Sequence, residues 1–144
     1  GFNYRLSDIN CALGLSQIKK LNSFIKKRKK IYNYYKTNLN NFKNLISFPK
    51  YNNKNNSSFH LVLINLGFKN LSKKNNFLNY MKKNKIFCQY HYIPLNKFSL
   101  IKEKTSKLND YKIYYRKTIS IPIHHSLSYS EMKYVVSKIK KYFS

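Results

Sequence analysis

Histidine and cysteine are the side chains most often recruited for metal binding and nucleophilic chemistry, and the chain has four histidines and two cysteines. His124 and His125 are adjacent, so their side chains point in different directions, and no carboxylate lies nearby in the sequence. Cys11 and Cys88 are far apart and lack CxxC or Cys/His spacing. The sequence therefore predicts no metal site and no disulfide framework, places the two adjacent histidines in a surface loop, and favours a reducing cytoplasm.

A second group of chemically capable side chains is the run Cys88, Gln89, Tyr90, His91 and Tyr92. In an extended segment, alternation places Gln89 and His91 on one face and Tyr90 and Tyr92 on the other, so that one pair can face a ligand while the other packs. On residue type alone, a buried histidine with hydrogen-bond partners is the preferred interpretation of His91.

Two further candidates, Asn3 and Arg5, lie near the start of the chain. Arg5 is one of few arginines among many lysines, and only a guanidinium can hold a carboxylate through two parallel hydrogen bonds. Each residue also has an ordinary interpretation. Asn3 can be a loop amide that caps the next helix, and Arg5 can form a salt bridge with Asp8.

The formal net charge of +25 suggests nucleic-acid binding, because clustered cations release counterions from phosphate backbones. However, there are only three arginines (Arg5, Arg28 and Arg116), and no RNP-type, zinc or basic-zipper pattern accompanies the lysines. Lys, Asn, Ile and Tyr are abundant throughout while Gly is rare and Trp is absent, which is typical of AT-rich coding. A lysine-rich module that binds nucleic acid or anionic surfaces stays an alternative, but a less favoured one.

The elements that must position these residues belong to one domain, because 144 residues with 42% hydrophobic content can bury a real core. Apolar residues recur at helical spacing from Leu6 to Leu39, with a possible break near Leu21 and with Ser7 as N-cap. The chain has no run of 18 apolar residues and no signal peptide, so neither membrane insertion nor export is expected.

The rest of the chain alternates between strand and helix patterns. The expected order is a strand buried on both faces, a helix, a second strand, a short helix, a third strand and a terminal helix, over 59–66, 71–84, 86–92, 109–117, 118–123 and from 129 onward. An Asn-rich loop over 51–58 precedes the first strand, and Ser128 with Glu131 forms a capping-box pattern. This order predicts a small α/β or α+β layer with the helices on one face of a small sheet.

Three stretches carry a resemblance to a known family. They are residues 1–8 (GFNYRLSD) followed by 12–17 (ALGLSQ), residues 89–95 (QYHYIPL) and residues 114–122 (YYRKTISIP). In order and spacing they resemble the DegT/DnrJ/EryC1/StrS family of vitamin B6-dependent sugar aminotransferases. The resemblance covers essentially the whole chain apart from the Asn-rich loop. The run from Cys11 to Gln17 is most similar to the branch that aminates a UDP-4-keto-6-deoxy-N-acetylhexosamine on the way to pseudaminic acid.

The resemblance implies the C-terminal small domain of a fold type I enzyme that uses pyridoxal 5'-phosphate (PLP). Such an enzyme passes an amino group from glutamate to a UDP-linked ketosugar, and it works as a homodimer with shared active sites. By the same resemblance, Asn3 binds the cofactor phosphate or its substrate adduct across the dimer, and Arg5 lies near anionic substrate groups. The segment 88–92 lines the sugar-nucleotide pocket.

The resemblance also implies what this chain lacks. The family's Schiff-base lysine lies in a Ser-rich stretch that precedes the first motif, and no lysine here has that context. We therefore expect that the N-terminal PLP-lysine domain is missing and that the chain alone completes no turnover; an inactive remnant of the enzyme is a further alternative. The chain departs from the family pattern at two places: Asn84-Lys85 stands in place of an expected glycine, and Asn96-Lys97 follows Pro94-Leu95. These departures concern sugar specificity more than the fold.

Overall fold

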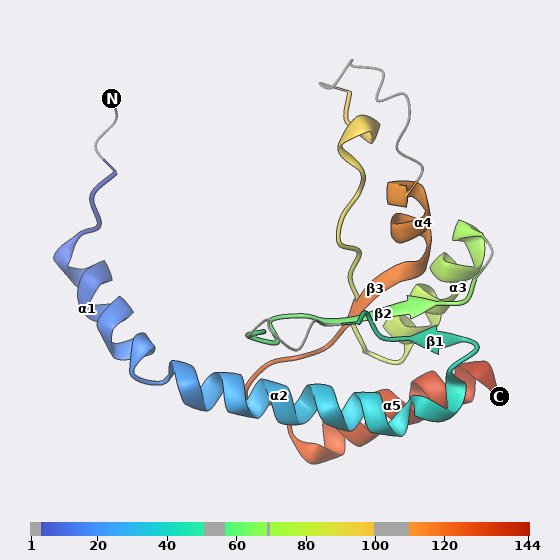
Figure 1. The fold of residues 1–144 in the computed structure, drawn as a ribbon, viewed down its shortest axis with the longest axis horizontal. Coiled ribbons are helices and arrows are strands. Elements are labelled where there is room, and N and C mark those ends of the chain that lie inside the picture. Colours follow the sequence, from blue (N-terminus) through green and yellow to red (C-terminus); the bar gives the residue numbers. More distant parts are fainter. Residues whose placement is uncertain (1–3, 51–56, 69, 100–109) are drawn as a thin grey trace.

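The computed structural model describes residues 4–50, 57–68, 70–99 and 110–144. Five helices, three short strands and two 3-10 turns follow one another along these residues (Figure 1). In chain order they are α1 (Asp8–Ile18), α2 (Leu21–Asn38), η1 (Asn40–Phe42), β1 (Ile46–Ser47), β2 (Val62–Leu66), α3 (Leu71–Lys83), η2 (Leu95–Lys97), α4 (Asp110–Lys117), β3 (Thr118–Ile121) and α5 (Tyr129–Phe143). The predicted α/β class is confirmed.

The sheet is antiparallel, with the order β1-β2-β3. Ile46 pairs with Leu66, and Val62 and Ile64 pair with Ile121 and Ile119, so these side chains share one face. All of them are buried, whereas Leu63 and Asn65 on the opposite face of β2 are only half-buried. The prediction that this strand is buried on both faces is therefore wrong for β2, because its second face is only partly covered, although all four residues of β3 are buried.

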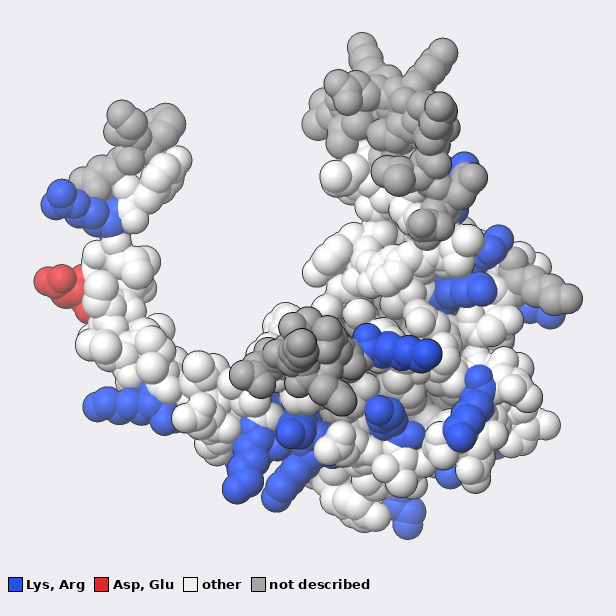
Figure 2. All heavy atoms as spheres, in the orientation of Figure 1, with Lys and Arg blue, Asp and Glu red and all other residues white. Residues whose placement is uncertain are grey.

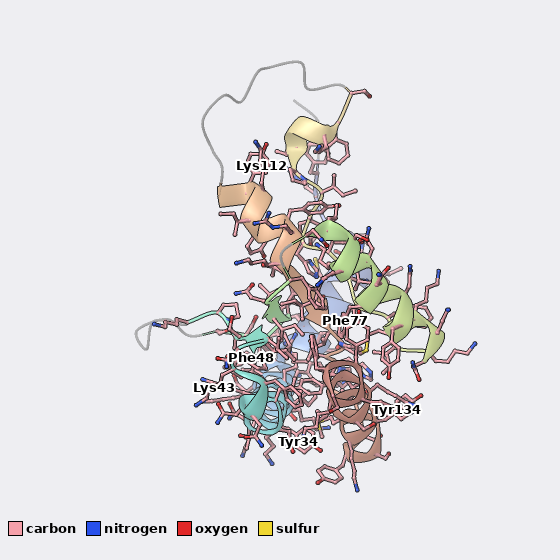
Figure 3. All side chains as sticks on the ribbon, turned by 90° about the vertical axis from the view of Figure 1, so that its right-hand side faces the viewer. Tyr34, Lys43, Phe48, Phe77, Lys112 and Tyr134 are labelled. Atoms are coloured by element: carbon pink, nitrogen blue, oxygen red, sulfur yellow. The ribbon has the colours of Figure 1, made fainter. Side chains whose placement is uncertain are left out.

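Three helices supply most of the remaining core residues. They contribute the buried residues Ile31, Tyr32 and Tyr35 from α2, Phe77 and Met81 from α3, and Val135, Val136 and Ile139 from α5. These residues recur at three- or four-residue spacing, as expected for a helix that buries one stripe. Figure 3 shows Phe77 at the junction of α3, the sheet and α5. The buried Tyr35 keeps its hydroxyl satisfied by donating to the Pro122 carbonyl at 3.0 Å.

Side-chain caps define where several helices begin. Ser7 accepts a hydrogen bond from the Asn10 amide at the start of α1, and Asn70 accepts one from the Lys73 amide at the start of α3. At α5 the predicted capping box is confirmed, since Ser128 Oγ accepts from the Glu131 amide and Glu131 Oε2 accepts from the Ser128 amide. The Ser128 hydroxyl also donates to Glu131 Oε2 at 2.6 Å, and this hydrogen bond, together with the one from the Ser128 amide, holds the pKa of the Glu131 carboxyl below its usual range.

The helical region predicted over 6–39 consists of two helices, α1 and α2, separated at Lys19 and Lys20. None of the residues of α1 is buried, and Figure 1 shows this helix standing away from the rest of the chain. α2, in contrast, lies beside α5 and packs against it. We refer to residues 4–20 as the arm and to the described residues from 21 onward as the body. No helix in the described ranges is both long and apolar enough to cross a membrane.

The prediction of a strand over 86–92 is wrong. In this segment only Gln89 forms a β-bridge, with Ser120 of β3, and the other residues have no ladder partner. The segment follows a tight reversal in which Lys85 has φ of 60°, the left-handed region that favours glycine. This is where the family pattern has its expected glycine. Of the predicted Asn-rich loop, residues 51–56 lie outside the described residues.

Candidate functional site

The segment 88–92 lies along the edge of β3 that β2 leaves free. The Gln89 amide donates to the Ser120 carbonyl at 3.1 Å, and the Ser120 amide donates to the Gln89 carbonyl at 2.9 Å. A single bridge does not impose the regular alternation of a strand. The side chains of this segment therefore take the directions that their own contacts dictate.

Tyr90 is anchored against α3 and α4. Its hydroxyl donates to Asn75 Oδ1 at 2.7 Å, and its ring stacks on Tyr115 with the centroids 5.6 Å apart. The Lys74 ammonium lies 4.3 Å from the centre of the same ring. Burial raises the pKa of Tyr90, with a smaller contribution from Tyr115, so the hydroxyl keeps its proton and acts as a donor.

His91 is buried and points at β3. Its Nε2 lies 2.6 Å from Ser120 Oγ in a hydrogen bond, while its Nδ1 is buried without a hydrogen-bond partner. Burial lowers the pKa of His91, and His60 lowers it further, so the ring is neutral at physiological pH. The sequence favoured a buried histidine with hydrogen-bond partners. This holds for Nε2 of the ring but not for Nδ1.

The predicted pairing of faces in this segment is wrong. Gln89 is exposed while His91 is buried, and Tyr90 is half-buried while Tyr92 is 74% exposed. The reason is that the segment lacks a ladder, so residues two apart need not share a face. Cys88 packs against the core, and burial raises the pKa of its thiol to about 12, so it stays protonated. Within the segment 88–92, Gln89 and Tyr92 are thus the two residues that the structure leaves open to a ligand.

The two remaining predicted site residues are Asn3 and Arg5. Asn3 is outside the described residues. Arg5 is exposed, and Figure 1 shows its segment, at the start of the arm, well away from β3. Within the described chain Arg5 and Asp8 form no ion pair, so the salt-bridge interpretation of Arg5 finds no support. The described residues therefore bring together 88–92, while Arg5 lies apart from them.

Three residues that sequence reasoning did not single out complete the surroundings of the segment: Lys74, Tyr115 and Ser120. Tyr115 and Ser120 belong to the string 114–122 that carries the family resemblance, and that string was the available signal. Lys74 had no such signal, because one lysine among so many gives no pattern.

Histidines, a hollow and many cations also occur elsewhere on the surface of the described residues. His60, His124 and His125 are exposed, and no group of three or more metal-ligating side chains occurs among the residues that the structure describes. A hollow of about 1160 Å³ lies between α2 and the segments flanking β1 and β2, and no residue of 88–92 lines it. Figure 2 shows lysine and arginine side chains spread over the visible face of the body instead of gathered into one patch.

A fit to PLP can be tested on the lysines, because a lysine forms the Schiff base with this cofactor. Among the described residues Lys74 is the single buried lysine. Its ammonium is covered by the rings of Tyr90 and Tyr115 and donates to the Tyr115 carbonyl. Such an enclosed amine leaves no approach for an aldehyde. Lys74 therefore does not fit the role of a Schiff-base lysine.

Comparisons with known proteins show which proteins this chain resembles in sequence and fold. Over 98% of its length the chain is 34% identical to the UDP-4-amino-4,6-dideoxy-N-acetyl-beta-L-altrosamine transaminase of Campylobacter jejuni subsp. jejuni serotype O:2. The fold matches Helicobacter pylori PseC, an aminotransferase involved in the biosynthesis of pseudoaminic acid, with a TM-score of 0.84, 28% identity and coverage of 99% of this chain and 39% of that one. It also matches Spr1654 of Streptococcus pneumoniae in its PLP form, with a TM-score of 0.83, 24% identity and coverage of 95% and 36%.

The Campylobacter relative is matched over 40% of its own length, so the chain spans about two fifths of the relatives that it resembles. The model of the DegT/DnrJ/EryC1/StrS aminotransferase family matches residues 1–140, which is nearly the whole chain. The three sequence strings, the α/β fold and the sequence identity agree with one another. The chain belongs to the DegT/DnrJ/EryC1/StrS aminotransferase family.

Proposed function

We propose that this chain forms the substrate-facing C-terminal part of a PLP-dependent nucleotide-sugar aminotransferase. In this proposal glutamate gives the amino group and a UDP-4-keto-6-deoxy-N-acetylhexosamine accepts it, which is a reaction of the pseudaminic acid type in the cytoplasm. The observation that carries the proposal is the 34% identity to the Campylobacter transaminase over almost the entire chain. The similarity of the fold to PseC supports it.

Gln89 and Tyr92 are the described residues that we assign to the sugar nucleotide. Both are exposed, while their neighbours Tyr90 and His91 hold the segment against the body. An amide and a phenol can each donate and accept, which suits sugar hydroxyls and an N-acetyl group. Arg5 is assigned to an anionic group and Asn3 to the cofactor or its adduct, as the family resemblance implies.

The cofactor and its lysine belong, in this proposal, to a part of the enzyme that these residues do not supply. The enclosed geometry of Lys74 supports that assignment. The active enzyme is proposed to be a homodimer with shared sites. The arm has exposed apolar side chains, which include Ile9, Leu15 and Ile18. Their exposure supports the proposal that another part of the complete assembly covers the arm.

A chimera tests the proposal directly. This chain replaces the aligned C-terminal two fifths of the Campylobacter transaminase, and amino transfer from glutamate to the UDP-4-ketosugar is followed by the mass of the product. We expect the chimera to be a dimer with activity, and the isolated chain with added PLP and glutamate to have none. Tyr92→Ala should lower kcat/KM by about tenfold or more, the loss expected for one hydrogen bond made in the transition state.

The matched control is Tyr129→Ala, because Tyr129 is also a largely exposed tyrosine but belongs to the first turn of α5, where its ring packs on Tyr34. Its kcat/KM should equal that of the unmodified chimera. A dimeric, PLP-loaded chimera that aminates other ketosugars but not this one would contradict the proposed substrate. Turnover by the isolated chain would contradict the proposed need for a lysine from elsewhere.

A further inference from the structure

Lys74 on α3 is the most unusual charged residue of the body, because its side chain is fully buried. Its Nζ lies over two aromatic rings, 4.3 Å from the centre of Tyr90 and 4.4 Å from the centre of Tyr115. It also donates a hydrogen bond to the Tyr115 backbone carbonyl. The cation is thus surrounded by two π faces and a carbonyl oxygen, the groups that can stabilise an ammonium without a counterion.

These contacts join three separate elements. Lys74 belongs to α3, Tyr115 lies in the last turn of α4, and Tyr90 belongs to the segment that carries Gln89 and Tyr92. The last turn of a helix exposes the negative end of its dipole, so the Tyr115 carbonyl is a favourable place for a cation. Figure 3 shows α3 and α4 side by side, and they contact each other. Lys74 therefore sits where two helices and the candidate site segment meet.

The segment 88–92 needs such an anchor. A strand inside a ladder is held by successive backbone hydrogen bonds, whereas this segment has the two bonds of a single bridge, at Gln89. Its position beyond that bridge depends on side chains: His91 bonded to Ser120, and Tyr90 bonded to Asn75 and covered by Lys74. If the Tyr90 ring is released, the backbone on both sides of it loses one of its two remaining supports.

Packing alone does not explain a lysine at this place. Burying an ammonium is unfavourable, and burial lowers the pKa of Lys74 to about 8, whereas an apolar side chain of similar length would carry no such penalty. What the cation adds is a directed interaction with two rings and one carbonyl, which an apolar residue cannot make.

We propose that Lys74 is a positioning residue whose ammonium fixes Tyr90 against α4 and thereby sets the placement of Gln89 and Tyr92 at the edge of β3. The meaning of that placement for a nucleotide sugar rests on the proposed function. The anchoring itself is a property of the chain and can be measured without a ligand.

Amide hydrogen exchange of the labelled chain by NMR is the decisive measurement. In Lys74→Met the Gln89 and Ser120 amides, which form the bridge, should exchange about tenfold faster or more, while the amides of β2 keep or lower their rates. Lys74→Arg should restore slow exchange, because a guanidinium also binds over aromatic rings. Lys73→Met is the matched control, since Lys73 is the exposed neighbour on the same helix, and it should change nothing.

Two results would overturn the proposal. One is unchanged exchange at Gln89 and Ser120 in Lys74→Met, and the other is an equal increase across β2, which would indicate a residue that only supports the whole fold. Tyr90→Leu gives a second route to the same answer if Lys74→Met fails to fold. It removes the ring under the cation and should reproduce the local increase, and unchanged exchange there also overturns the proposal.

The measurement is independent of catalysis. An inactive chimera would speak against the proposed function, while the exchange rates would still decide about Lys74. In an active chimera, Lys74→Met should lower kcat/KM for the UDP-4-ketosugar and Lys74→Arg should recover it. Loss of activity in Lys74→Met without faster exchange at Gln89 would overturn the positioning role.

Discussion

The arm and the body begin two of their helices in the same way and then differ. α1 and α5 both start at a serine whose hydroxyl accepts a hydrogen bond from the amide three residues on. α5 then buries Val135, Val136 and Ile139, whereas α1 buries nothing and carries its apolar residues around the helix instead of on one face. The comparison shows that a cap fixes where a helix begins, while burial decides whether the helix contributes to the fold.

The largest test of this comparison is a pair of truncations, one in each region. Phe77→Ala should lower the free energy of unfolding by about 3–5 kcal/mol, because the fully buried ring packs against Phe68, Tyr142 and Phe143 and its loss leaves a cavity. Leu13→Ala in the arm should change it by less than about 0.5 kcal/mol, because Leu13 is exposed. Urea unfolding measures both. A comparable loss in the two variants would show that the arm is packed in solution.

The second test uses pH. Burial lowers the pKa of Lys74 to about 8 in the folded chain, below the ordinary lysine value of 10.5, so the unfolded chain binds more protons between these values. Stability from this group therefore rises with pH across that window, and the penalty for burying the cation is fully present below about pH 8. From about pH 7.5 to 9.5 the wild type should gain about 2 kcal/mol relative to Lys74→Met.

The wild type must be compared with Lys74→Met because other groups also titrate. Burial raises the pKa values of Cys88 and Tyr35, and groups with raised pKa values of this kind make the folded chain less stable as pH increases. Urea unfolding at the two pH values gives the difference. Deletion of residues 1–19 should leave this pH-dependent difference in stability unchanged if it arises from the body alone. A flat difference between the wild type and Lys74→Met would show that the ammonium is solvated.

Sequence patterns predicted the body best where local chemistry and burial agree. The capping box at Ser128 and Glu131 needs only two residues three apart, and the apolar stripe of α5 follows it at helical spacing. Both features are local, so a single sequence contains them. The third motif, residues 114–122, likewise contains Ser120 and Tyr115, but the sequence did not indicate that they contact the segment 88–92.

What the sequence could not provide was long-range pairing. The alternating pattern over 86–92 is compatible with a strand, but a strand also requires a partner along its length, and β3 offers this segment one bridge. Lysines are rarely buried, and residue type alone gave no reason to expect the buried Lys74. Helical spacing is also a local pattern, so it could not show whether another part of the protein covers α1.

A third test concerns the backbone of the body. Lys85 has φ of 60°, a conformation that costs a residue with a Cβ atom more than it costs glycine. Lys85→Gly should therefore raise the free energy of unfolding by about 1 kcal/mol, although glycine also loses more entropy on folding. Thermal unfolding measures the change, and Lys82→Gly inside α3 is the control, which should destabilise by about 1 kcal/mol. Destabilisation by Lys85→Gly would show that another backbone conformation prevails there.

The smallest effects come from the two serine caps, which match in residue type and hydrogen-bond geometry. Ser128→Ala should lower the free energy of global unfolding by about 1 kcal/mol, because α5 is part of the core and its first amides lose their acceptor. Ser7→Ala should leave global unfolding unchanged within about 0.3 kcal/mol and should instead speed amide exchange within α1, because a helix that buries nothing opens without the body. Circular dichroism during urea unfolding and residue-resolved hydrogen exchange separate the two responses. Equal losses of global stability would mean that α1 folds cooperatively with α2, and the division into arm and body would then be wrong.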